Sequence, residues 1–204
     1  MLTLDKEKTL FLLGRYDWEM CTIRNLLDLS QFHYVDNHLH WNNAKLSGYR
    51  NEIERFLIDD VLMSIYGIEL ENDIFCTDSR YHLIDHHNAM SKFSSVLEQV
   101  MTLLQFPMNR YCQLVDSNDK RYILEMLAMG TINEEIDMIR RSDRMAQGIT
   151  KEDERLAEKA ISENSVRVGD LLVKVLTSRF APIVTMFFFF NLIQLMSGRI
   201  MGNG

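Results

Sequence analysis

The hydrophobic pattern of the first 105 residues alternates between two spacings. Short runs of apolar and β-branched residues, typical of buried strands, lie at 8–14, 32–37, 62–70 and 80–87. Segments with apolar residues at helical spacing lie between or after these runs, at 16–29, 44–62 and 94–106. Strands that alternate with helices predict an α/β fold with a mostly parallel sheet flanked by helices, in which ligands bind outside the carboxyl ends of the strands.

Further along the chain the pattern becomes helical and then returns briefly to strand. Three amphipathic pieces between 119 and 164 are separated by Gly130 and Gly148, which are typical of the residue that follows the end of a helix. Residues 170–178 favour a strand. Capping boxes predict two helix starts, at Ser95 with Glu98 and at Thr150 with Asp153. We expect an α/β domain, a helical segment packed on it, and a short strand region with an apolar tail, over 1–118, 119–165 and 166–204.

Composition narrows the classes of protein that fit this pattern. A chain of 204 residues can bury a sizeable core, and a net charge of −7 argues against a surface that binds long nucleic acid. A short phosphorylated substrate remains compatible with that charge. Cys21, Cys76 and Cys112 are widely spaced, and the chain has neither a CxxC pair nor a signal-peptide pattern. We therefore expect a cytoplasmic protein without disulfides.

The most apolar stretch lies near the end of the chain, at 181–196. Its 16 residues include Pro182 and are fewer than the ~20 that a membrane-spanning helix needs, so we expect no membrane anchor. After Thr185, a run of four Phe and several Met lacks polar alternation. Our hypothesis is that this tail is a truncated or frame-shifted version of a longer parent, whose exposed apolar surface would favour homo-oligomers. Intact longer frames in close relatives would support the hypothesis, and an identical stop in all of them would refute it.

Candidate chemistry centres on "LIDHHN", residues 83–88, at the end of the fourth predicted strand. Asp85, His86 and His87 lie where a parallel sheet exposes side chains to a ligand crevice. Carboxylate together with imidazole suits manganese, iron or zinc. The same letters also fit polar residues that begin a loop, but their position at a strand end favours a metal site.

Asp85-His86-His87, preceded by an apolar pair and followed by Asn88, resembles the signature of the DHH phosphoesterase superfamily. The order of elements over 8–125 is also similar to the N-terminal domain of that superfamily. The resemblance implies hydrolysis of phosphodiesters, phosphomonoesters or pyrophosphate with two Mn²⁺ or Mg²⁺ ions. It implies Asp85 and His86 as metal ligands. His87 would lie beside the metals and stabilise developing charge or protonate the leaving group, so Asp85 and His87 are the candidate catalytic residues.

The resemblance also implies acids at the ends of two earlier strands. The Asp-x-Asp pair that the superfamily carries after its first strand matches Asp17 and Glu19. Both residues would equally suit the first turn of a helix, through its dipole. The acid at the end of the strand before the signature matches Glu69 or Asp78, and we favour Glu69 because it closes the stronger strand.

A last acid is implied after a later helix, where the sequence offers Asp116 and Asp119. We favour Asp119, which would alternatively cap the next helix. The candidate metal ligands are then Asp17, Glu19, Glu69, Asp85, His86 and Asp119.

Two further residues are candidates for substrate binding. His38 follows the second strand and alternates with His40, so both could face a metal or substrate, or simply solvate an edge. Arg140, Arg141 and Arg144 form a second candidate group, from which we select Arg144 as a phosphate ligand. The alternative is that these arginines only form the solvent-exposed face of a helix.

The chain departs from the superfamily after residue 125, where no glycine-rich, histidine-bearing second domain occurs. The helical segment would then close over the site as a lid. Our interpretation is a metal-dependent phosphoesterase that acts on a nucleotide, short oligonucleotide or pyrophosphate-type substrate by a two-metal mechanism. The alternative is a non-catalytic nucleotide- or protein-binding module derived from such an enzyme.

Overall fold

The structure is a computed structural model that describes residues 4–58, 64–74, 76–87, 94–163, 165–168 and 171–174. The chain forms two compact units, Met1–Tyr122 and Ile123–Gly204, and each is considered by itself. The first unit contains the sheet on which the candidate site is built.

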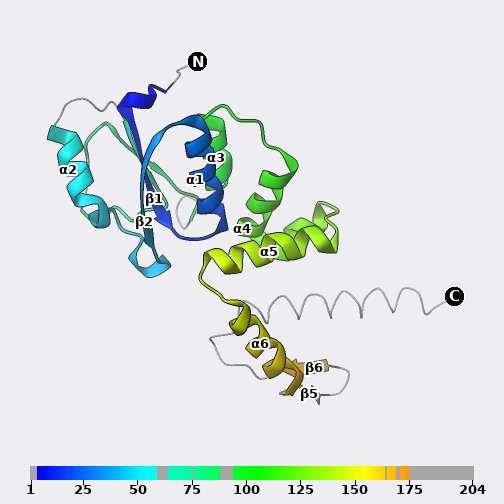
Figure 1. The fold of residues 1–204 in the computed structure, drawn as a ribbon. Helices are drawn as coiled ribbons and strands as arrows, with labels where there is room; N and C mark the ends of the chain where they lie inside the picture. The colour runs from blue at the N-terminus through cyan, green and yellow to red at the C-terminus, as the bar shows by residue number, and fades with distance from the viewer. Residues whose placement is uncertain are drawn as a thin grey trace. The chain divides into compact units, whose positions relative to one another are not determined.

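A four-stranded, all-parallel sheet forms the centre of the first unit (Figure 1). Its strands follow the order β2 (His33–Leu39), β1 (Thr9–Arg15), β3 (Ser64–Ile68) and β4 (Tyr81–Ile84). This arrangement confirms the predicted α/β fold with a parallel sheet flanked by helices. Because β2 lies on one side of β1 and the later strands lie on the other, the strand order reverses between β1 and β3. Ligands bind at such a reversal, outside the carboxyl ends of the strands.

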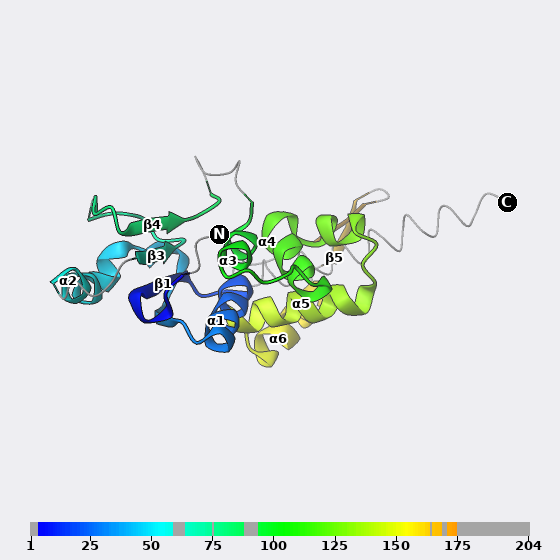
Figure 2. The same cartoon turned by 90° about the horizontal axis from the view of Figure 1, so that it is seen from above.

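Helices cover both faces of the sheet (Figures 1 and 2). On one face lie α1 (Trp18–Ser30) and α3 (Val96–Leu103), and on the other lies α2 (Arg50–Ile58). Short 3-10 helices occur at Lys6–Lys8, Trp41–Asn43 and Leu46–Tyr49. The predicted start at Ser95 is confirmed, because its Oγ accepts a hydrogen bond of 3.2 Å from the amide of Glu98.

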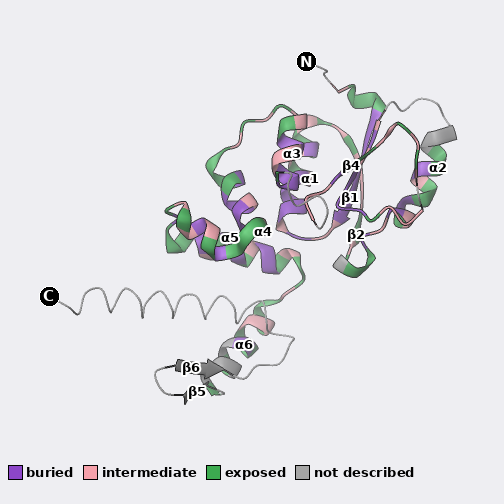
Figure 3. Cartoon of the chain, turned by 180° about the vertical axis from the view of Figure 1, so that it is seen from behind, coloured by how far each residue is buried: buried purple, intermediate pink, exposed green. Residues whose placement is uncertain are grey.

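The central strand β1 is buried on both faces (Figure 3). Leu10 and Leu12 belong to a core cluster with Tyr49 and Ile53, on the α2 face. The alternate residue Phe11, fully buried, points to the opposite face, under α1 and α3. A strand covered on both faces needs apolar residues at every position, which explains the unbroken apolar run in the sequence.

The helix that carries Asp119 begins earlier than the sequence predicts. α4 (Arg110–Ala128) starts after Asn109, whose Oδ1 accepts a hydrogen bond of 2.9 Å from the amide of Cys112. Asp119 therefore lies within this helix, and the alternative prediction that it caps a helix is wrong. Non-helical backbone angles at Arg121 and Tyr122 kink α4 where the first unit ends.

The second unit consists of helices followed by a short antiparallel strand pair. Its elements are the end of α4, α5 (Asn133–Ala146), α6 (Lys151–Glu163), β5 (Ser165–Val168) and β6 (Leu171–Lys174). Gly130 and Gly148 have φ angles of 70° and 82°, in the left-handed conformation predicted for helix ends. The predicted capping box is also confirmed, since Thr150 and Asp153 exchange hydrogen bonds between side chain and amide.

Part of the predicted C-terminal region lies outside the described residues. Of the predicted strand at 170–178, the structure shows β6 over Leu171–Lys174. The hypothesis of a truncated tail concerns residues beyond those described. In the part of the chain that is described, no helix is both long and apolar enough to cross a membrane.

Candidate metal centre

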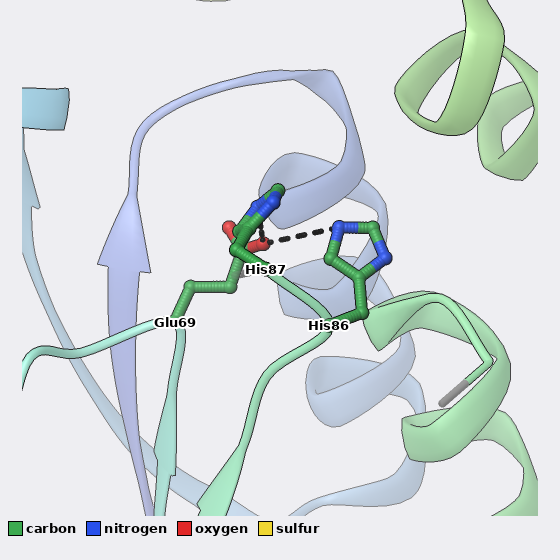
Figure 4. Close-up of side chains that lie close together, drawn as sticks. All are labelled: Glu69, His86 and His87. Carbon is green, nitrogen blue, oxygen red and sulfur yellow. Dashed lines mark ion pairs between the residues drawn. The ribbon is translucent and has the colours of Figure 1, made fainter. Parts of the chain in front are cut away.

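Acidic and imidazole side chains from distant parts of the sequence meet at the carboxyl ends of three strands. Glu69 directly follows β3, and Asp85–His87 directly follows β4. From α1, which comes after β1, Glu19 reaches the same place, and Asp119 reaches it from α4. Figure 4 shows Glu69 together with the two histidines.

Two backbone features let β1 and β3 end close together. A Cβ atom on Gly14 would overlap the backbone carbonyl oxygens of Ile68 and Glu69, so only glycine fits at this position. Glu69 itself has a φ of 50°, and its amide donates a hydrogen bond of 2.9 Å to the carbonyl of Ile84. A left-handed conformation at a residue other than glycine costs about 1 to 3 kcal/mol. The turn ends β3 at the point where the Glu69 carboxylate meets the histidines.

The first group of potential metal ligands is the Glu19 cluster, formed by Glu19, His86 and Asp119. One ligand atom from each residue lies within 4.8 Å of the others. The shortest distance, 2.9 Å, joins His86 Nε2 to Asp119 Oδ2. Glu19 Oε1 accepts a hydrogen bond of 2.9 Å from the amide of Leu97, in the first turn of α3. This bond fixes the carboxylate of Glu19 and leaves its second oxygen for the cluster.

The second group is the His87 cluster, formed by Glu69, His86 and His87. Glu69 Oε1 lies 2.7 Å from His87 Nε2 and 3.7 Å from His86 Nε2, as the dashed lines in Figure 4 indicate. His86 therefore belongs to both clusters. The cluster is bordered by Arg15, the last residue of β1, whose Nη1 lies 2.5 Å from His87 Nε2 and 3.9 Å from Glu69 Oε1.

Four atoms of these clusters are buried without a hydrogen-bond partner among the described residues. They are Glu19 Oε2, Glu69 Oε1, His86 Nε2 and Asp119 Oδ2. Two of them, His86 Nε2 and Asp119 Oδ2, lie 2.9 Å apart, at ion-pair distance. Each unsatisfied buried polar atom costs about 1 to 3 kcal/mol. Oxygen and imidazole nitrogen atoms that converge without donors match the ligands of a borderline divalent ion such as Mn²⁺, so the residues fit a metal.

The electrostatics of the clusters also favour a cation. Burial raises the pKa of Glu19 well above its usual value, and the negative charges of Asp119, Glu69 and Asp17 raise it further. The contact with Asp119 raises the pKa of His86, despite its partial burial, and the charges of Glu69 and Asp85 act in the same direction. The main cause differs, burial for Glu19 and the contact with Asp119 for His86, but in both cases the neighbouring acids favour added positive charge at the site.

Two predicted ligands, Asp17 and Asp85, are not among the converging atoms. Asp17 caps α1, since its Oδ1 accepts a hydrogen bond of 2.9 Å from the amide of Met20. Asp85 Oδ1 likewise accepts a hydrogen bond of 2.9 Å from the amide of His87. The carbonyl of Asp85 accepts one of 3.2 Å from Gln99 Nε2. In the structure, both aspartates shape the backbone that carries the clusters.

Asp78 and Asp116, the acids that the sequence offered as alternatives, pair with basic side chains outside the clusters. Asp78 binds the guanidinium of Arg80, which lowers the pKa of Asp78 to about 2. Asp116 lies 3.0 Å from Lys120 Nζ. Of each pair of alternatives, the structure brings the preferred member, Glu69 or Asp119, into the clusters.

The predicted substrate ligand His38 belongs to neither cluster. Its φ of 50° interrupts the extended backbone of β2, so the alternation with His40 on which the prediction relied does not hold. The His38 side chain is exposed, lies 3.4 Å from Asp36 and packs edge-on against the ring of Tyr16.

The predicted phosphate ligand Arg144 is buried within the second unit. Its Nε and Nη2 atoms donate hydrogen bonds of 3.0 and 2.8 Å to Glu154 Oε1. The neighbouring Arg140 is also buried and pairs with Asp143 at 3.1 Å. Both guanidinium groups therefore have carboxylate partners inside the unit.

Sequence reasoning missed the arginine at this site. Arg15 follows Gly14 at the end of the predicted first strand, so its position at the carboxyl edge of the sheet was a usable signal. The phosphate ligand predicted from the sequence, Arg144, lies instead in the helical segment. No protein-family model, curated protein or solved structure matches this chain.

Proposed function

We propose that this chain is a metal-dependent phosphoesterase of the DHH type that hydrolyses a small phosphorylated substrate, such as a nucleotide, a short oligonucleotide or a pyrophosphate compound. The observation that carries the proposal is the convergence of four buried polar atoms, from Glu19, Glu69, His86 and Asp119, that have no hydrogen-bond partner among the described residues. A divalent ion held there would polarise a phosphoryl oxygen and lower the pKa of a bound water. The imidazole of His86 favours Mn²⁺ over Mg²⁺.

The residues of the chain would divide the work of holding this ion. Glu19, His86 and Asp119 supply ligand atoms, and Glu69 supplies an oxygen 3.7 Å from His86 Nε2. Glu19 is fixed by its bond from the amide of Leu97. Hydrogen bonds of this kind orient a metal ligand, and removing the group that makes one typically lowers metal affinity by about 10- to 100-fold.

The substrate would approach from the side of His87. The side chain of His87 is 25% exposed, whereas that of Glu69 is 1% exposed and that of His86 is 9% exposed. A substrate phosphate that reaches the clusters would therefore meet His87 before the deeper residues. The backbone amide of His87 donates a hydrogen bond to the Asp85 carboxylate. This bond holds the backbone of His87 and so positions its ring for contact with the leaving oxygen.

Metal binding tests this proposal most directly. We expect His86→Ala to weaken Mn²⁺ binding by at least about 100-fold, because it removes the nitrogen shared by both clusters. His82→Ala is the matched control, since His82 lies on β4, which leads to His86, and its exposed side chain packs against the ring of Tyr66. The control should bind Mn²⁺ as the wild type does in equilibrium dialysis.

Activity is then measured with bis(p-nitrophenyl) phosphate and a panel of phosphomonoesters, short oligonucleotides, cyclic dinucleotides and pyrophosphate. Hydrolysis by the wild type and by His82→Ala, with loss in His86→Ala, supports the proposal. Equal turnover in all three proteins refutes the assignment of the site. Mn²⁺ binding without hydrolysis of any compound would refute catalysis and favour the non-catalytic nucleotide-binding module.

A further inference from the structure

The two clusters differ in whether an arginine contributes a permanent positive charge. Arg15 Nη1 lies 2.5 Å from His87 Nε2, in the His87 cluster. His87 Nε2 also lies 2.7 Å from Glu69 Oε1. The guanidinium and the carboxylate therefore both border the nitrogen that would face a metal ion in this cluster. Because a guanidinium has only N–H donors and carries a positive charge, it occupies the place that a second ion would need.

Arg15 also supplies charge to the acid of the same cluster. Its Nη1 lies 3.9 Å from Glu69 Oε1, and the Glu69 side chain is only 1% exposed. Because arginine keeps its proton at all accessible pH values, this positive charge is permanent. The guanidinium thus provides the counter-charge that a second metal ion would otherwise provide to Glu69 and His87.

The Glu19 cluster contains no such cation within the described residues. Its acids make no ion pair there with lysine or arginine, and the nearby Lys120 is paired with Asp116 at 3.0 Å and with Glu98 at 3.5 Å. Glu19 Oε2, His86 Nε2 and Asp119 Oδ2 all lack hydrogen-bond partners in the described part of the chain. The buried carboxylates that lack a neighbouring arginine or lysine are therefore those of the Glu19 cluster.

We propose that the site holds one divalent ion, bound by the Glu19 cluster, and that the guanidinium of Arg15 acts as the second positive charge beside it. The inference rests on the proposed function and replaces the two ions expected from the sequence with one ion and a guanidinium. The Arg15 side chain is 16% exposed, so it can meet a ligand as well as Glu69. Arginine binds phosphate oxygens through paired N–H groups, which makes a phosphoryl group the ligand class expected between Arg15 and the ion.

The number of Mn²⁺ ions bound per chain tests the inference without any activity measurement. The wild type should bind one ion in equilibrium dialysis and show the electron paramagnetic resonance spectrum of an isolated Mn²⁺. Arg15→Gln keeps much of the side-chain volume but removes the charge, so it should bind a second ion at least tenfold more weakly than the first. Arg50→Gln, which changes an exposed arginine on α2, is the control and should still bind one ion.

Each outcome separates this inference from the proposed function. Two ions in the wild type, or a spectrum of two coupled ions, overturn the role of Arg15 and leave the proposed function intact. One ion in both the wild type and a folded Arg15→Gln also overturns it. No ion in the wild type contradicts the proposed function itself. If Arg15→Gln does not fold by circular dichroism, the wild-type spectrum alone decides, since coupled ions refute the inference and an isolated ion supports it.

Discussion

Glu19→Gln should stabilise the metal-free protein, although it removes a buried side-chain charge. The ligand oxygens of Glu19 and Asp119 lie within 4.8 Å of each other, and at an effective dielectric constant of about 20 two such charges repel by about 3.5 kcal/mol. A protonated His86 offsets part of this repulsion. The amide oxygen of glutamine can still accept the bond from Leu97, and its NH₂ group can donate to Asp119. We expect a net gain of about 2 kcal/mol, or about 4 to 8 °C in Tm.

The assay is thermal unfolding followed by tryptophan fluorescence, because both tryptophans, Trp18 and Trp41, lie in the first unit. Saturating Mn²⁺ should reverse the order of stability: at 100 times Kd it adds about 2.7 kcal/mol to the wild type and little to the variant. Glu54→Gln, at an exposed position on α2, should change stability by less than about 0.5 kcal/mol. A metal-free Glu19→Gln that melts below the wild type would refute the reasoning, because it would mean that the protein itself satisfies the Glu19 carboxylate.

Three other predictions follow from the same contacts. The pKa values of Glu19 and His86 are raised above 4.5 and 6.5 in the folded state, so the stability they contribute is present at low pH and lost as pH rises. Chemical unfolding of the metal-free protein should therefore show stability falling as the pH rises above 4.5, and Mn²⁺ should abolish this slope. Gly14→Ala should lower the free energy of unfolding by about 2 to 3 kcal/mol, because rigid backbone blocks the new methyl group; an unchanged urea midpoint would contradict this. Arg144→Ala leaves Glu154 without its partner, so it should cost about 2 kcal/mol, seen as faster hydrogen exchange in α5 and α6, without changing Mn²⁺ affinity.

Much of the fold could be predicted because its signals are local. The unbroken apolar run of β1 reports burial on both faces, and Ser95 and Gly148 mark helix ends through bonds or backbone angles that involve only a few neighbours. The start of α4 was missed because Asn109, which caps it, follows a short loop and precedes no strongly apolar turn. His38 was misplaced because a single left-handed residue breaks strand alternation, and nothing in its neighbours shows this.

The sequence by itself determined the residue types of the candidate site and their position at strand ends, because the order of strand, turn and acid can be read directly from the chain. Only the tertiary structure decided which of them meet. In the structure Glu19 of α1 and Asp119 of α4 meet His86, which follows β4 at the edge of a sheet with the strand order β2-β1-β3-β4. The same fold places Arg15, at the end of β1, against His87, a contact between residues 72 positions apart. Long-range packing sets such distances, and no local pattern contains them.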